Sequence, residues 1–349
     1  MKATAIAPSN IAFIKYWGVK DALLRLPANN SISMNLSNLF TTTTVEFSQD
    51  FKEDKVVINK STNPSQPPLV RGGVLVSPPD KGELEGVLVA RDRVITHLDR
   101  IRSLAKISLK AKVVSVNNFP TGTGLSSSAS GFAALTTAAA AAAGLKLSEK
   151  DLSILARLGS GSACRSIPDG FTEWIQGETN ETSYAVSLYP PDYWDIVDIV
   201  AVVSIGPKDV PTSQGQKLAK SSPFFSVRLK HMHEKIKTIK KYLKEKKFTL
   251  LGELIEYEAL ELHAIMLTSN PSLIYWLPGT ISVMKKVQKW RKEGIQAYFT
   301  VNTGQDIHII CQKKDAEKIS KLIKEIPEVK QIIINYPSKG SRLSLDHLF

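Results

Sequence analysis

The chain has 349 residues, 43% of them hydrophobic, so it can bury a large core and exceeds the usual length of one domain. Its 45 Lys and Arg against 33 Asp and Glu give a net charge of +12, which favours polyanionic partners: nucleic acid, an anionic membrane or phosphorylated small molecules. Two cysteines without CxxC spacing, Cys164 and Cys311, exclude a disulfide framework, and no apolar segment of signal-peptide length begins the chain, so a cytoplasmic location is expected.

Alternating β-type segments predict an antiparallel sheet near the N-terminus, with strands over residues 2–7, 31–36, 42–47 and 55–59. A stretch rich in Pro and Gly, residues 61–86, predicts a long excursion. A helix over 88–105 and a strand over 107–116 are expected next. The Ala-rich run 133–145 predicts a buried helix that is too short to span a membrane.

The second half predicts a split β-α-β layer in which helices pack against an antiparallel sheet. The expected strands cover residues 184–188, 196–205, 296–301, 306–312 and 329–334, the helices cover 224–246, 249–269, 278–293 and 316–326, and a polar loop covers 206–222. The YPPDY loop near residue 190 then separates a lobe of residues 1–190 from a lobe of residues 191–349. The basic run from Arg228 to Lys247 predicts a solvated helix face, because no aromatic residues or nucleic-acid module accompany it.

The segment from Val114 to Gly131, VSVNNFPTGTGLSSSASG, predicts a phosphate-binding loop between a strand and a helix. Glycines at 122 and 124 let successive amides converge on an anion, and the helix adds free N–H groups and the positive end of its dipole. The spacing is neither that of a Walker loop nor that of a dinucleotide-binding loop. A turn that only caps the helix is the plainer alternative. The residues expected to form this binding loop are Pro120, Thr121, Gly122, Thr123, Gly124, Leu125, Ser126, Ser127 and Ser128, and its serines supply hydroxyls for phosphate oxygens or a metal ion.

The string PTGTGLSSSA resembles the loop that holds the ATP phosphates in the GHMP kinases, the superfamily of galactokinase and mevalonate kinase. Three more strings resemble the mevalonate-pathway decarboxylases of that superfamily: APSNIAFIKYWG with LPANNSIS, then GSGSACRS, then EALELHAIM. The resemblance spans nearly the whole chain. It implies an α+β, two-lobed fold, with helices on antiparallel sheets, an ATP-binding N-terminal lobe, a ferredoxin-like C-terminal lobe and an active-site cleft between them.

The resemblance also implies ATP-driven decarboxylation of a 5-phosphorylated mevalonate, a step of isoprenoid biosynthesis. Phosphorylating the tertiary 3-hydroxyl turns it into a leaving group, and loss of the C1 carboxylate as carbon dioxide supplies the electrons of the new double bond. Arg165 can bind that carboxylate through a bidentate fork. Mg²⁺ is expected with the ATP phosphates and Ser127, and a homodimer is the habit of the superfamily. The implied substrate contacts are Asn10, Lys15, Tyr16, Ser160, Ser162, Arg165, Ser213 and Gln214.

One departure from the family concerns the length of the 5-phosphate chain. The family normally has Lys two residues after the Trp of KYWGK, and Val19 stands there in this chain. Members that act on the monophosphate tend to lack that Lys, and the string LRLPANNSISMNL is closer to them. The sequence therefore favours conversion of 5-phosphomevalonate to isopentenyl phosphate, with diphosphomevalonate decarboxylation to isopentenyl diphosphate as the alternative.

The second departure concerns the catalytic base. The family's aspartate belongs to the string Asp-x-Gly-x-Asn, and the matching string here is Asn302-Thr-Gly-Gln-Asp306. A carboxamide cannot accept the 3-hydroxyl proton, and loss of a general base costs about 10²- to 10⁴-fold. Three explanations stay open: an engineered Asp→Asn change that traps a complex, a natural ATP-independent bisphosphomevalonate decarboxylase without the kinase step, or a base role taken over by Asp306 or another group.

Rival classes predict different features. An RNA-binding module would show salt-dependent RNA affinity and no nucleotide pocket, and a simple kinase of the superfamily would stop at a phosphorylated acid. A zinc site at His231 and His233 is disfavoured, because side chains two apart on a helix diverge. The sequence therefore favours small-molecule partners, without nucleic acid or membrane.

Overall fold

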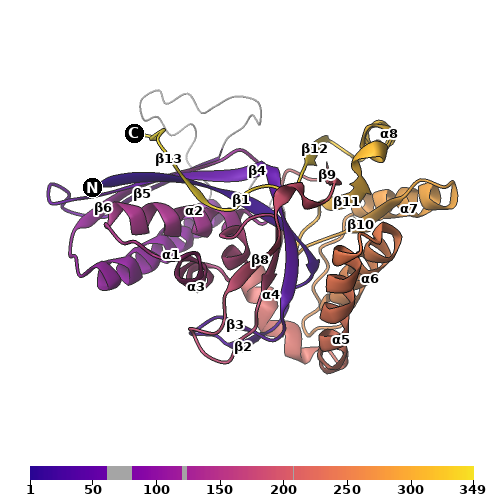
Figure 1. Cartoon of the computed structure of the whole chain (residues 1–349), viewed down its shortest axis with the longest axis horizontal. Helices are drawn as coiled ribbons and strands as arrows, with labels where there is room; N and C mark the ends of the chain where they lie inside the picture. The colour runs from indigo at the N-terminus through magenta and orange to yellow at the C-terminus, as the bar shows by residue number, and fades with distance from the viewer. Residues whose placement is uncertain (61–80, 120–123, 207) are drawn as a thin grey trace.

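The computed structural model describes residues 1–60, 81–119, 124–206 and 208–349, which form two main sheets with helices packed on them (Figure 1). The first sheet has the order β13-β1-β4-β6-β5, and a branch through β7 and β8 extends from β4. Its strands are β1 (Lys2–Ile14), β4 (Ser31–Ser48), β5 (Lys55–Lys60), β6 (Lys110–Asn117), β7 (Phe171–Trp174), β8 (Ala185–Tyr189) and β13 (Arg342–Ser344).

Two predictions for this sheet are wrong in detail. The strands expected over 31–36 and 42–47 form one continuous strand, β4, which pairs with β1 along most of its length. The sheet is also mixed, because β5 runs parallel to β6. Parallel neighbours need a crossover connection, and α1 (Lys81–Ala105) lies in the chain between these two strands. Residues 81–86, expected in the irregular excursion, are therefore helical.

Three helices cover one face of the first sheet: α1, α2 (Ser127–Ala142) and α3 (Glu149–Gly159) (Figure 1). The buried alanines of α2 pack with Ala5, Val45 and Val113 of the sheet in one apolar cluster. Small side chains allow a close approach of helix and strands, which explains why the Ala-rich run is buried on nearly all sides. The short strands β2 (Val19–Asp21) and β3 (Leu26–Pro27) form a separate hairpin.

The second sheet is antiparallel, as predicted, with the order β10-β11-β9-β12. The strands are β9 (Ile196–Val202), β10 (Ala297–Thr300), β11 (Ile307–Gln312) and β12 (Gln331–Asn335), and the helices are α5 (Phe225–Lys244), α6 (Phe248–Leu267), α7 (Pro278–Lys292) and α8 (Lys313–Lys324). Alternate residues of β9 belong to two apolar clusters, so this strand is buried on both faces. The loop expected over 206–222 contains a helix, α4 (Thr212–Leu218).

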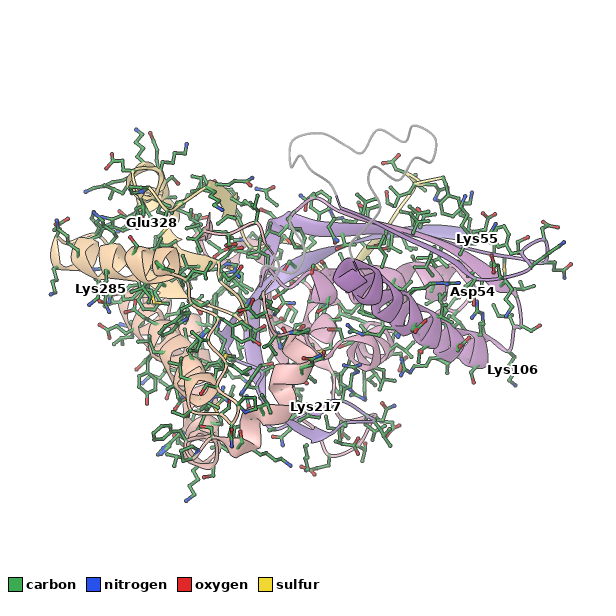
Figure 2. The ribbon with its side chains drawn as sticks, turned by 180° about the vertical axis from the view of Figure 1, so that it is seen from behind. Asp54, Lys55, Lys106, Lys217, Lys285 and Glu328 are labelled. Atoms are coloured by element: carbon green, nitrogen blue, oxygen red, sulfur yellow. The ribbon has the colours of Figure 1, made fainter. Side chains whose placement is uncertain are left out.

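The two halves of the chain pack against each other around one apolar cluster, to which Ile11 and Phe13 of β1 and Ile239 of α5 contribute. Lys240 of α5 also forms an ion pair with Glu173 of β7 across 2.6 Å. In Figure 2, Asp54 and Lys106 mark one end of the molecule and Lys285 the other. No helix within the described ranges combines the length and the apolar character that a membrane crossing requires.

Candidate active site

A cavity of about 350 Å³ lies between the two halves, and both of them line it. Five basic side chains face it, and no acidic side chain does among the described residues. The basic residues are Lys15, Arg25, Arg93, Arg165 and Lys208. Hydroxyl and amide groups supply the other polar contacts, from Tyr16, Ser126, Ser127, Ser128, Ser160, Ser162, Thr212, Ser213, Gln216, Asn302 and Thr303. Such a lining suits a ligand with several negative charges.

The predicted phosphate loop reaches the cavity through Gly124 and through the serines that begin α2. Gly124 has φ +108°, and a Cβ on it would come within 2.6 Å of the Gly304 Cα. Two glycines thus let the loop of the first half approach the β10–β11 turn of the second half. Leu125 is buried in the core, and its carbonyl accepts a hydrogen bond from Ser9 Oγ (2.6 Å). Residues 120–123, predicted to bind ATP, lie outside the described residues.

Arg165 lies in a short 3-10 helix, η1 (Gly161–Ser166), and is buried at the cavity wall. Its guanidinium donates to Ser31 Oγ (2.6 Å), Ser33 Oγ (3.0 Å) and Asn10 Oδ1 (3.1 Å). All three acceptors are neutral, and burial lowers the pKa of Arg165. A buried cation with neutral neighbours favours a bound anion, such as a carboxylate. Asn10 does not line the cavity; it lies behind Arg165 and also donates to Ser166 Oγ (2.9 Å).

Lys15 joins the first half of the site to the second. Its ammonium donates to the Ala12 carbonyl (2.7 Å), to Thr300 Oγ1 (2.7 Å) and to Asn302 Oδ1 (3.1 Å). Burial lowers the pKa of Lys15 to about 7. Tyr16 also lines the cavity, and its ring meets that of Trp174 edge-on, with 4.6 Å between the centroids.

This pKa predicts proton uptake when an anionic substrate binds. At pH 8 the free Lys15 amine is largely neutral, and a phosphate or carboxylate beside it favours the charged form, so binding should take up as much as about one proton. The heat of substrate binding, measured in two buffers of different ionisation enthalpy, gives that uptake. Lys208, whose pKa burial lowers to about 8, contributes as well. The uptake should fall in Lys15→Met, and an unchanged value would contradict this assignment.

Asn302 lies two residues after β10 and contacts both halves of the site. It accepts from Lys15, its Nδ2 donates to Ser126 Oγ (3.2 Å), and its backbone carbonyl lies 3.0 Å from His263 Nε2. Asp306, a proposed substitute base, is not part of the described cavity lining, and its Oδ1 accepts from the backbone N–H of Val203 (2.9 Å). That position does not support a base role for Asp306.

The remaining predicted contacts divide into two sets. Ser160, Ser162 and Ser213 line the cavity, whereas Gln214, on the same turn of α4 as Ser213, is exposed and does not. Gln216, which the sequence did not single out, lines it instead, and its Oε1 accepts from the backbone N–H of Gly18 (2.6 Å). Arg25 and Arg93 were missed as well. Arg25 belongs to the string LRLPANNSISMNL, whose pattern does not single out the arginine, and Arg93 is one of several basic residues along α1.

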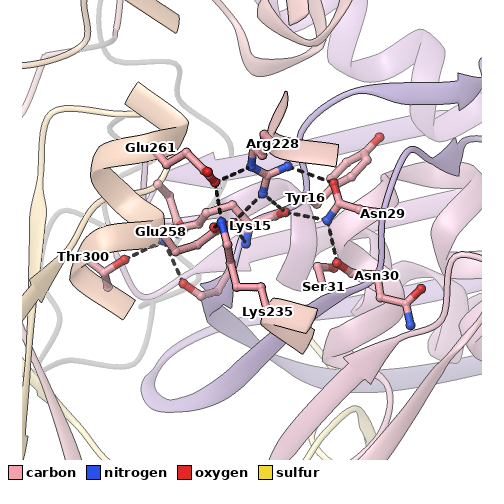
Figure 3. Close-up of polar contacts among 12 residues, drawn as sticks. Lys15, Tyr16, Asn29, Asn30, Ser31, Arg228, Lys235, Glu258, Glu261 and Thr300 are labelled. Carbon is pink, nitrogen blue, oxygen red and sulfur yellow. Dashed lines mark hydrogen bonds and ion pairs between the residues drawn. The ribbon is translucent and has the colours of Figure 1, made fainter. Parts of the chain in front are cut away.

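Behind Lys15 lies a buried network of charges between α5 and α6 (Figure 3). Glu258 accepts the backbone N–H of Lys15 (3.0 Å) and forms ion pairs with Arg228 and with Lys235 (2.8 Å). Arg228 also donates to Asn29 Oδ1 (3.0 Å) and to the Lys15 carbonyl (2.9 Å). The predicted solvated face of this basic helix is therefore wrong at Arg228 and Lys235: Arg228 binds the Lys15 carbonyl, and Lys235 pairs with the Glu258 carboxylate that accepts the Lys15 N–H.

Replacing Glu258 by Gln is expected to lower the free energy of unfolding by about 3 kcal/mol, because two buried cations lose their carboxylate. Burial alone raises the pKa of Glu258, but Arg228 and Lys235 outweigh it and hold that pKa below its usual value. The stabilisation is therefore present at neutral pH and is lost as the pH falls through the lowered pKa. Urea unfolding at pH 7 measures it.

The matched control is Glu261→Gln, which removes a partly exposed member of the same network. Glu261→Gln should lower the free energy of unfolding by clearly less than Glu258→Gln does, because solvent screens the Glu261 carboxylate. Equal losses in the two variants would contradict a special role for the buried carboxylate.

No cluster of three His, Cys, Asp or Glu side chains that could hold a metal ion occurs in the part of the chain that the structure describes. The serines at the start of α2 can contribute single hydroxyl ligands to a cation that phosphates already carry. The residues present therefore fit a magnesium ion that arrives with a nucleotide.

Two family models match the chain and together cover most of it. A diphosphomevalonate decarboxylase-like N-terminal domain matches residues 7–70 and 79–185, and a mevalonate 5-diphosphate decarboxylase C-terminal domain matches residues 198–345. Among characterised relatives, the diphosphomevalonate decarboxylase of Candida albicans is 33% identical and aligns over 92% of this chain and 87% of its own. The phosphomevalonate decarboxylase of Haloferax volcanii is also 33% identical, over 93% and 92%.

Solved structures agree with this relationship and confirm the predicted fold. Mevalonate diphosphate decarboxylase from Staphylococcus aureus is 37% identical, with a TM-score of 0.85 over 98% of both chains. A structure described as MDDEF in complex with MVAPP, AMPPCP and magnesium is 35% identical, with a TM-score of 0.85 over 99% of both chains. The resemblance read from the sequence is therefore confirmed: the chain belongs to the mevalonate-pathway decarboxylases of the GHMP kinase superfamily, a family of carboxy-lyases that act on phosphorylated mevalonates.

Proposed function

We propose that this protein converts mevalonate 5-diphosphate to isopentenyl diphosphate in an ATP-dependent decarboxylation. The observation that carries the proposal is the cavity between the two halves, which five basic side chains line together with the serines at the start of α2, and which no acidic side chain lines among the described residues. Most of the relatives compared above act by name on the diphosphate, which favours this substrate over the monophosphate that Val19 suggested.

The proposed division of roles follows the geometry. Arg165 binds the C1 carboxylate, and Asn10 with Ser31 and Ser33 holds its guanidinium in place. Lys15 faces the oxygens of the phosphoryl group that moves, because its ammonium lies between Thr300 and Asn302 at the cavity wall. The other proposed substrate contacts are Tyr16, Ser160, Ser162 and Ser213, which line the cavity. The proposed ATP contacts are residues 120–128, with Ser127 also a ligand of the magnesium ion.

In the decarboxylation step the C1–C2 bond breaks and its electron pair forms the C2=C3 double bond. The bond between C3 and its phosphorylated oxygen breaks, and phosphate leaves with the electron pair of that bond. Arg165 positions the charged C1 carboxylate until the C1–C2 bond breaks. The other basic side chains of the cavity stabilise the negative charge on the departing phosphate.

Asn302 supports a second candidate, an ATP-independent elimination from a substrate that already carries a 3-phosphate. Asn302 lies between Lys15 and Ser126, where the family has its aspartate, and no carboxylate lines the described part of the cavity. An elimination needs no base for the 3-hydroxyl. The chain would then keep the phosphate and carboxylate contacts and omit the kinase step.

One experiment separates these functions. The purified protein is given mevalonate 5-diphosphate, mevalonate 5-phosphate or mevalonate 3,5-bisphosphate, each with and without Mg-ATP, while ADP and carbon dioxide are measured. We expect ADP and carbon dioxide in equal amounts from the 5-diphosphate. Carbon dioxide without ATP from the bisphosphate would establish the second candidate, and ADP without carbon dioxide would leave a simple kinase.

We also propose that residues 1–190 form the ATP-binding lobe and residues 191–349 a C-terminal lobe built on a ferredoxin-like sheet and its helices, although β13 returns to the first sheet. A homodimer is proposed from the habit of the superfamily, and sedimentation of the purified chain tests it.

A further inference from the structure

The cavity holds more positive charge than the proposed roles of Lys15 and Arg165 use. Arg25 and Arg93 also line it, and neither has a carboxylate partner in the described part of the chain. Burial and, second, the nearby Arg25 lower the pKa of Arg93. Two neighbouring guanidinium groups that repel each other at a cavity wall favour a bound anion.

The hairpin that carries Arg25 is fixed on both sides of it. The Leu24 N–H donates to Asp21 Oδ1 (2.8 Å), and the Leu24 carbonyl accepts from Nε of the buried Arg157 (3.0 Å). Arg25 itself has φ +50°, a left-handed conformation that costs a residue with a side chain on the order of 1 kcal/mol. Anchored neighbours and a left-handed turn together hold Arg25 at the cavity.

Arg25 lies close to residues that the proposed function assigns to the substrate. Arg93, its neighbour, donates to the carbonyl of Gly159 (3.1 Å), the residue before Ser160. Burial raises the pKa of Tyr16 to about 12, and the charge of Arg25 opposes that rise. Arg25 is therefore near both the serine segment and Tyr16, which the proposed function assigns to the substrate.

The valine at position 19, where the family has a lysine, makes the nearby Arg25 relevant to substrate binding. Val19 lies on β2 opposite Pro27 of β3, and Arg25 immediately precedes β3, so both belong to one small hairpin. We propose that Arg25 binds the terminal phosphate of a 5-diphosphate substrate and replaces the ammonium that the family has at the position of Val19. This inference rests on the proposed function and goes beyond it, because it names the residue that selects the diphosphate.

Calorimetric binding of mevalonate 5-diphosphate, mevalonate 5-phosphate and a non-hydrolysable ATP analogue tests the inference. Arg25→Ala should weaken diphosphate binding by about 10- to 100-fold, the usual range for a charged hydrogen bond, and monophosphate binding by less than about threefold. Arg25→Lys should keep most of the affinity. In the Arg25→Ala background, Val19→Lys should restore the preference for the diphosphate.

Lys20→Ala is the matched control, because it removes a cation of the same hairpin that pairs with Glu178 and does not line the cavity. It should leave all three affinities unchanged. An equal loss for both mevalonate phosphates in Arg25→Ala, or a loss for the ATP analogue alone, would overturn the assignment. If the unmodified protein binds neither mevalonate phosphate, the proposed function itself fails, and thermal unfolding of each variant checks that it is folded.

Discussion

Asn302→Asp is expected to raise the rate of ADP release from Mg-ATP and mevalonate 5-diphosphate by about 10²- to 10⁴-fold, the usual contribution of a general base. The side chain lies at the cavity wall between Lys15 Nζ (3.1 Å) and Ser126 Oγ (3.2 Å). A carboxylate of nearly the same shape fits there, accepts a hydrogen bond from both neighbours and can take the 3-hydroxyl proton. The buried Lys15 would also gain an opposite charge, so its pKa should rise from about 7.

Two controls make this result specific. Asn302→Ala should show no gain, because it removes the amide without supplying a base. Asp306→Asn in the Asn302→Asp background should leave the gain intact, since Asp306 holds the backbone of Val203 and does not line the described cavity. If Asn302→Asp releases ADP no faster on either the 5-phosphate or the 5-diphosphate, a trapped or base-deficient kinase is excluded. The ATP-independent elimination would then remain.

The sequence predicted the parts of the site that lie in continuous strings. The loop ending at Ser128, the segment around Arg165 and the KYWG segment that follows β1 each carry a local pattern, and each contributes side chains to one cavity. Local patterning also accounts for the strands of the second sheet, because β9, β10 and β11 are short and almost entirely buried segments. Chemistry that a short string encodes can therefore be predicted from the amino-acid sequence alone.

Contacts between distant residues could not be predicted in this way. Lys15 and Asn302 are 287 positions apart, and only the fold brings the ammonium to the amide. The parallel pairing of β5 with β6 depends on a crossover through α1, which the local β pattern of residues 55–59 does not report. Arg25 was missed for a similar reason, since its role follows from a left-handed turn and from anchors supplied by Arg157.

Arg165→Gln is expected to lower the rate of carbon dioxide release by about 10³-fold, because two charged hydrogen bonds to the C1 carboxylate, each worth about 1.5 to 3 kcal/mol, are lost. Its Ser31, Ser33 and Asn10 neighbours are neutral, so removal of the guanidinium leaves no buried carboxylate behind. The variant should therefore fold, and thermal unfolding checks this.

In Arg165→Gln the amide can still donate one hydrogen bond to the carboxylate. The phosphate contacts of the cavity also stay in place, so ADP release should fall much less than carbon dioxide release. Arg102→Gln provides the comparison, because Arg102 is also buried but pairs with Asp54 and Asp99 away from the cavity. That change should lower the stability and keep the ratio of carbon dioxide to ADP. An Arg165→Gln protein that keeps this ratio, or that decarboxylates within about tenfold of the unmodified chain, would remove Arg165 from the carboxylate and transfer that role to another cation of the cavity.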